Sequence, residues 1–148
     1  MYVATAVVAV LFPMVAEQQA KGNDTRPLFG KAMLYGGGVS VCCAVGMNLF
    51  GRWLFPMLFG ERYAQAIPLL LPISCFVVSV TFITILMNYL TAKAQTRILT
   101  VTLSSGFVLI VLLVSLFHKD IAQMLYIMSI VLFVVFFVNL PNVLTQKY

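Results

Sequence analysis

Polar side chains recur at helical spacing inside one strongly apolar stretch of this sequence. Steps of three, four, three and four residues separate them, so they share one face of a helix. These residues are Thr81, Thr84, Asn88, Thr91 and Gln95. Hydroxyl and amide groups in such positions either hydrogen-bond a neighbouring helix or line a wet cavity that passes a polar solute. Both interpretations stay open, and in the second we expect Asn88 to contact the solute.

Two cations, Lys93 and Arg97, follow at the end of the same stretch, four residues apart. Paired cations there can bind an anionic lipid headgroup, or a diphosphate carried on a lipid substrate. Such residues more commonly anchor a helix end at the membrane surface, with their side chains extended toward water. The pair is therefore a candidate headgroup or diphosphate contact, with simple anchoring as the more ordinary alternative.

A second pattern places small residues at every fourth position of another apolar stretch. Its members are Gly36, Ser40, Ala44 and Asn48. A stripe of small side chains lets a neighbouring helix approach closely inside a membrane. We therefore interpret it as a helix-packing face in preference to a solute site.

Residue types that carry catalysis or bind metals are few and scattered. No charged residue lies deep in an apolar stretch, and the one histidine, His118, sits in a polar turn. The three cysteines fall within apolar stretches, without the clustering that metal ligands need. We therefore expect no metal, no cofactor and no enzymatic activity. The net charge of +5 is too dispersed for a nucleic-acid site.

Composition identifies the elements that must position these residues. The chain has 148 residues, of which 62% are hydrophobic and 9% charged, with a mean hydropathy of +1.05. Soluble domains are about 25% charged, and about 20 apolar residues suffice for a helix to cross a membrane. The charge-free runs predict an all-α, polytopic transmembrane helical bundle that forms a single domain. Its expected spans, about five, are residues 2–16, 34–50, 67–90, 98–117 and 121–140.

The connections between these spans carry boundary signals. Thr25 or Asp24 is suited to cap the helix that follows it, because short polar side chains accept the first free amides. We expect residues 51–63 to form the connection after span 34–50, with Trp53 as an aromatic residue at the membrane interface.

Lysine and arginine are twice as frequent in one set of alternating connections as in the other. One side holds Lys21, Arg26, Lys31, Lys93, Arg97 and Lys147. The opposite side holds Arg52, Arg62 and Lys119. Because cytoplasmic loops carry the excess of these residues, the first side is predicted to be cytoplasmic, and the C-terminal tail with it.

Three segments resemble, in order, the connections of polysaccharide-biosynthesis flippases. "LFPMVAEQQAKGNDTRPLFGKAM" is similar to their cytoplasmic link, where a span ends in Phe-Pro and an acidic segment follows. "FPMLFGERYAQAIPLLLPIS" is similar to their outer connection, and "NYLTAKAQTRIL" to the next inner link. Over about residues 13–99 the chain thus resembles the multidrug/oligosaccharidyl-lipid/polysaccharide flippase superfamily.

That resemblance implies part of the C-terminal lobe of a two-lobed carrier in the cytoplasmic (inner) membrane. Such carriers move isoprenoid-diphosphate-linked oligosaccharides by alternating access, for surface polysaccharide synthesis. The implied partners are membrane lipid, the lipid-linked oligosaccharide and either an N-terminal lobe that this sequence lacks or a partner chain, so we expect a fragment. The cationic cavity residues of the family have no counterparts, because the expected spans hold no buried lysine or arginine.

Other interpretations stay open. A multidrug/cation antiporter of the same superfamily would need an ionisable residue in the membrane, and the expected spans contain no Asp or Glu. A non-transporting scaffold subunit of an envelope-polysaccharide complex would need no solute path. A membrane-embedded glycosyl-polymerising enzyme is disfavoured, since histidine and carboxylates are confined to the connections.

Overall fold

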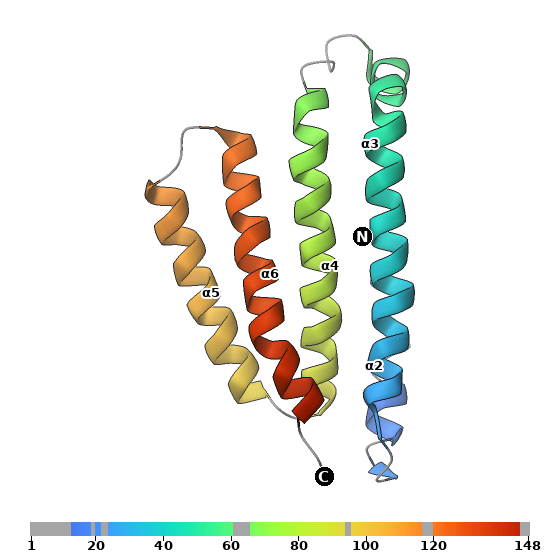
Figure 1. Ribbon diagram of the computed structural model, residues 1–148, viewed down its shortest axis with the longest axis vertical. Helices are drawn as coiled ribbons and strands as arrows, with labels where there is room; N and C mark the ends of the chain where they lie inside the picture. Colours follow the sequence, from blue (N-terminus) through green and yellow to red (C-terminus); the bar gives the residue numbers. More distant parts are fainter. Residues whose placement is uncertain are drawn as a thin grey trace.

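The computed structural model describes residues 13–18, 20–21, 24–60, 66–93, 96–116 and 120–145, without the side chains of 96–99 and 142–145 (Figure 1). Every regular element within these ranges is helical. After a helical segment at residues 13–18, they are in chain order α2 (Arg26–Ala32), the π-helix η1 (Met33–Gly37), α3 (Gly38–Phe59), a 3-10 turn at residues 66–69, α4 (Leu70–Ala92), α5 (Thr96–Leu116) and α6 (Ile121–Thr145).

Three of the described helices are long and apolar enough to cross a membrane. They cover Arg26–Phe59, Ala66–Ala92 and Ile121–Pro141, while Thr100–Leu116 is a shorter apolar helix. The all-helical class is therefore confirmed for the described residues, three of the expected spans coincide with helices that could cross a membrane, and these helices indicate a membrane protein. The count of five stays a prediction, because residues 2–12 and the side chains of residues 96–99, at the start of α5, lie outside the described part.

The long helices run alternately up and down, and their order across the molecule differs from their order in the chain. In Figure 1, α4 lies between α3 and α6, and α5 lies outside α6. The helices α5 and α6 approach each other closely: a Cβ atom on Gly106 of α5 would lie 2.7 Å from Val135 Cγ2 of α6. Only a glycine lets α5 pack so near to α6.

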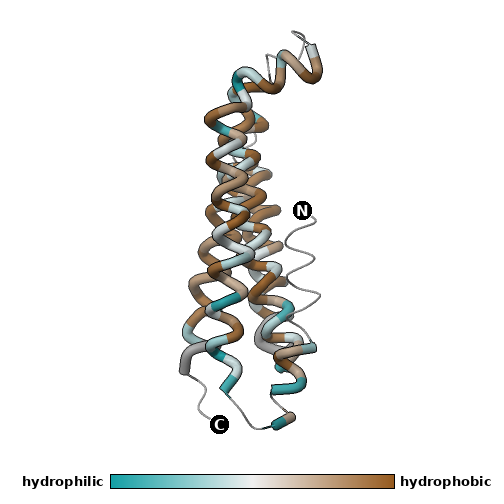
Figure 2. The backbone as a smooth tube through the Cα atoms, turned by 90° about the vertical axis from the view of Figure 1, so that its right-hand side faces the viewer, coloured by the Kyte–Doolittle hydropathy of each residue, from teal (hydrophilic) through white to brown (hydrophobic). Residues whose placement is uncertain are grey.

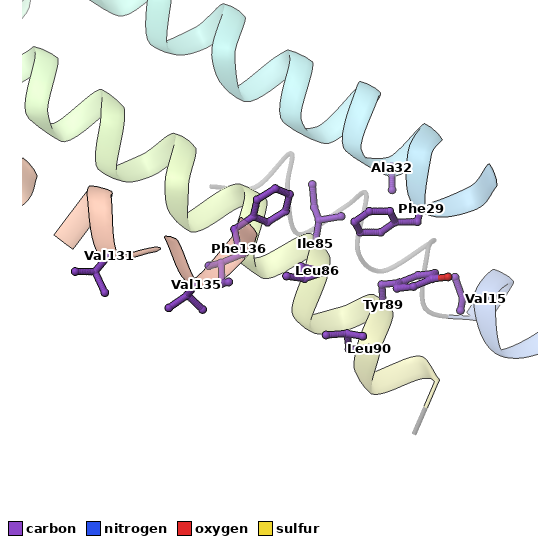
Figure 3. Close-up of a cluster of buried hydrophobic side chains, with 11 residues drawn as sticks. Val15, Phe29, Ala32, Ile85, Leu86, Tyr89, Leu90, Val131, Val135 and Phe136 are labelled. Carbon is purple, nitrogen blue, oxygen red and sulfur yellow. The ribbon is translucent and has the colours of Figure 1, made fainter. Parts of the chain in front are cut away.

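The most buried apolar side chains gather near the end of the bundle where α2 begins (Figure 3). Tyr89 and Leu86 of α4 are fully buried there, against Phe29 of α2 and Phe136 of α6. The rings of Phe29 and Tyr89 have centroids 4.8 Å apart. This core therefore joins three helices at one end, whereas much of α3 above it is exposed on its outer face.

The first long helix changes its winding at a glycine triplet. The π-helical turn η1 contains Gly36 and Gly37, both buried, and α3 resumes at Gly38. Such wide turns occur within α-helices as local insertions. A Cβ atom on Gly37 would lie 3.0 Å from Cζ of Phe82 on α4, so the bare backbone packs directly on that ring.

The helix continues further than the sequence predicted. Residues 51–63 were expected to form a connection, yet α3 runs through Pro56 to Phe59 and ends at Gly60, whose φ is +84°. An internal proline removes one amide and frees one carbonyl, which bends a helix without always ending it. Figures 1 and 2 show the last turns of α3 turning aside from the bundle axis. Residues 61–65 lie outside the described part.

The contact at Gly37 predicts a position-specific loss of stability. Gly37→Val would push into Phe82, whose ring is held in place by Phe136 at 5.6 Å between centroids. We expect this overpacking to destabilise the fold by about 1–3 kcal/mol. The matched control is Gly38→Val, since nothing lies within 4 Å of a Cβ atom there. Thermal unfolding in detergent, followed by circular dichroism, checks the difference, and equal midpoints would contradict the packing.

Candidate functional site

The small-residue stripe of the first long helix faces the upper part of α4. Ser40 Oγ donates a hydrogen bond to Thr81 Oγ1 at 3.2 Å. One heptad away on α4, Ser74 Oγ accepts a bond from Asn48 Nδ2 at 2.9 Å. The structure thus brings the two polar patterns of the sequence together, as a seam of interhelical hydrogen bonds between α3 and α4. We call these four residues the α3–α4 seam.

A cavity of about 380 Å³ lies along this seam. Gly36, Ser40 and Ala44 form part of one wall, and Ser74 and Thr81 contribute to the other. Valine, isoleucine, methionine and cysteine side chains complete the lining, so the surface is mainly apolar with a few hydroxyl groups. A pocket of this kind suits a molecule that is partly apolar and carries neutral hydrogen-bonding groups.

The lower part of the α4 stripe makes a different kind of hydrogen bond. Thr84, Asn88 and Thr91 each donate to the backbone carbonyl four residues earlier, at 2.7, 2.8 and 2.7 Å. Asn88 is half-buried and Thr91 is exposed, while Gln95 lies outside the described residues. The five stripe residues therefore do not act as one set: Thr81 pairs with α3, and the next three are bonded within their own helix.

The cation pair can be placed only in part. Lys93 Nζ lies 5.1 Å from the ring centroid of Tyr89, a cation–π contact at the end of α4. The side chain of Arg97 lies outside the described part of the structure. Lys93 thus sits at the same end of the bundle as Arg26 and Lys31 of α2 (Figure 1).

Two buried contacts were not anticipated from the sequence. Thr25, the N-cap residue of α2, does not cap with its side chain; its Oγ1 atom is hydrogen-bonded to Tyr89 OH at 2.9 Å, with both residues fully buried. Asp24 instead accepts from the Arg26 amide at 3.0 Å. Between α4 and α6, the hydroxyl oxygens of Ser79 and Ser129 are 2.9 Å apart.

Among the described residues, a buried side-chain oxygen of Asn139 has no hydrogen-bond partner. Asn139 of α6 is 1% exposed, and its Nδ2 atom donates to the Val135 carbonyl at 2.8 Å. Its Oδ1 atom accepts no hydrogen bond. An unpaired buried acceptor weakens a fold. Across the residues described, no group of three His, Cys, Asp or Glu side chains is placed to hold a metal ion.

No protein-family model, curated protein or solved structure gives a significant match to this chain.

The seam predicts which positions can be cross-linked. Ser40→Cys combined with Thr81→Cys, in a chain whose three native cysteines are changed to alanine, should form a disulfide on mild oxidation. The reason is that the side-chain oxygens they replace are only 3.2 Å apart. Mass spectrometry detects the loss of two hydrogens. The control pair is Ser40→Cys with Thr91→Cys, because Thr91 is exposed further along α4; equal cross-linking of both pairs would contradict the arrangement.

Proposed function

We propose that this chain is part of a membrane carrier that flips isoprenoid-diphosphate-linked oligosaccharides across the cytoplasmic membrane. The observation that carries the proposal is the cavity along the α3–α4 seam, where hydroxyl groups line an otherwise apolar surface. A lipid-linked sugar combines an apolar chain with many neutral hydroxyl groups, so such a lining matches its chemistry. The three flippase-like connections in the sequence support the same assignment.

The polar face of α4 is suited to follow a moving solute. Thr84 and Asn88 donate to carbonyls that already belong to the helical hydrogen-bond ladder. If these side chains turn to a sugar hydroxyl, the carbonyls keep their helical partners, so no buried group is left unpaired. A neutral path also avoids the cost of placing a charge in the membrane. In the complete carrier we propose that this face borders the path of the sugar.

The diphosphate needs a different environment. Lys93 lies at the end of α4 where α2 also presents Arg26 and Lys31. Cations at a membrane surface attract phosphate groups, at about 1 kcal/mol for each lysine or arginine. We propose that this end faces the cytoplasm, with the C-terminal tail on the same side, and that Lys93 and Arg97 contact the diphosphate while the sugar is loaded.

The alternative carrier of the same superfamily, a cation antiporter, has less support. Neither α3, α4, α5 nor α6 contains Asp or Glu. A carboxylate within the membrane is the usual means of coupling transport to an ion. The sugar-carrying interpretation therefore ranks first for this segment.

Ligand retention tests the proposal directly. The purified chain in nanodiscs, examined by native mass spectrometry, should retain an isoprenoid-diphosphate-linked oligosaccharide in preference to phosphatidylglycerol. Lys93→Gln should weaken retention about fivefold, the equivalent of one phosphate contact. Arg52→Gln is the control, because Arg52 lies near the opposite end of the bundle. Equal retention of both lipids, or equal loss in both variants, would argue against the proposal.

Labelling of the α4 face tests the path. Asn88→Cys, in the complete carrier without its native cysteines, should react with a water-soluble maleimide because a sugar path must be hydrated. Val101→Cys is the control, since Val101 is an exposed apolar residue on the outermost helix, α5. The expected result is reaction at Asn88→Cys, reduced by the lipid-linked sugar, and none at Val101→Cys. Failure of Asn88→Cys to react in either access state would remove α4 from the path.

A further inference from the structure

The first long helix exceeds what a membrane needs. Arg26–Phe59 contains 34 residues. At 1.5 Å per residue a straight helix of that length would span about 51 Å, whereas the hydrocarbon core is about 30 Å thick. The excess has to tilt, enter water, or bend along the membrane surface. The point at which this helix stops packing against the other helices decides between these three possibilities.

The helix leaves α4 after Gly51. A Cβ atom on Gly51 would lie 2.6 Å from Leu70 Cδ1, so the two helices touch closely at this level. The structure describes every residue from Arg52 to Phe59, and none of these residues is buried. Figures 1 and 2 show this segment turning aside from the axis of the bundle. We call Arg52–Phe59 the α3 arm.

The α3 arm exposes large apolar side chains. Trp53 is 80% exposed, Met57 85% and Leu58 67%. Phe55 and Phe59 pack on each other, with ring centroids 5.5 Å apart. A segment of this composition is unfavourable in water, so an apolar environment must cover it.

The composition and position of the arm identify that environment as lipid. The arm continues directly from a helix that is apolar enough to cross a membrane, and it begins 26 residues after the start of that helix, more than the about 20 residues that the hydrocarbon core needs. Its only charged residue is Arg52, whose long side chain can extend to the headgroups, and Trp53 next to it is the residue type most typical of the membrane interface. Pro56 has no amide hydrogen, which leaves a carbonyl free for water or a headgroup.

We infer that the α3 arm lies along the membrane interface, at the end of the bundle opposite Lys93, and anchors α3 in the lipid with Trp53 at the depth of the ester groups. The helix thereby crosses the hydrocarbon core up to about Gly51 and then follows the surface. This inference does not depend on what the chain transports, because any membrane protein with this helix would place the arm in the same way.

Trp53 makes the inference measurable, since it is the only tryptophan in the sequence. The full chain is reconstituted in phosphatidylcholine vesicles that carry a nitroxide quencher either on the headgroup or near the end of the acyl chain. Emission should be blue-shifted, poorly quenched by acrylamide, and quenched about twofold more by the headgroup label than by the deep label. The profile should not change with the protein-to-lipid ratio.

A control variant measures how deep the membrane-crossing part of the same helix lies in the bilayer. Trp53→Phe with Val45→Trp moves the fluorophore to an exposed site on the same helix, two turns before Trp53. There the deep label should quench more strongly than the headgroup label, because this site lies inside the hydrocarbon core. The comparison between the two proteins removes differences in labelling and vesicle composition.

Three results would overturn the inference. Red-shifted emission with strong acrylamide quenching would place the arm in water. Emission shielded from both lipid labels, and dependent on protein density, would place it against a second copy of the chain. A profile identical to that of the Val45→Trp control would place the arm deep in the hydrocarbon core as a continuation of the span.

Discussion

Helices inside hydrocarbon gain nothing by hiding apolar side chains from water, since the lipid is as apolar as they are. What joins the helices of this chain is therefore shape, together with polar groups that have no water to bond. Glycines let α3 meet α4 and α5 meet α6, and each stands where an added methyl group would collide with a neighbour. Hydroxyl and amide pairs then fix the register, on the α3 side at Ser40 and Thr81 and on the α6 side at Ser79 and Ser129.

Because α4 lies between α3 and α6, it takes part in most of these pairs. The carrier hypothesis depends on the polar groups of α4 that are not used in helix packing. Its upper hydroxyl groups are engaged with α3, beside a cavity of about 380 Å³. Further along the same face, Thr84 and Asn88 donate to the backbone of their own helix. Packing and the proposed solute contact are thus compatible on one helix, since separate turns of the same face would serve each. The two interpretations of the polar stripe that the sequence left open therefore need not exclude one another.

Much of this arrangement could be predicted from the sequence, and the features that could not be predicted have identifiable physical reasons. Spacing alone placed Ser40 and Asn48 on one face of the first long helix and Thr81 on a face of the next. In the structure, Ser40 bonds Thr81 and Asn48 bonds Ser74, which joins the two faces. Periodicity does not say which helix lies next to which, so the neighbour relation of α4 and α6 was not predictable. The pair Thr25 and Tyr89 was missed because Thr25 fits an N-cap equally well. The sequence placed the end of α3 too early, because Pro56 bends the helix without ending it. A sequence pattern does not show which of these two effects a proline has.

The bond between Thr25 and Tyr89 joins residues 64 positions apart, and with the α3–α4 seam it closes a hairpin at both ends. During synthesis this hairpin emerges before α6 exists. Its seam groups find partners within it, and Ser79, which later meets Ser129, already donates to the Cys75 carbonyl at 2.7 Å. The polar groups of the hairpin therefore need no later helix for their hydrogen bonds, whereas the apolar core at Tyr89 and Leu86 is completed only by Phe136 of α6.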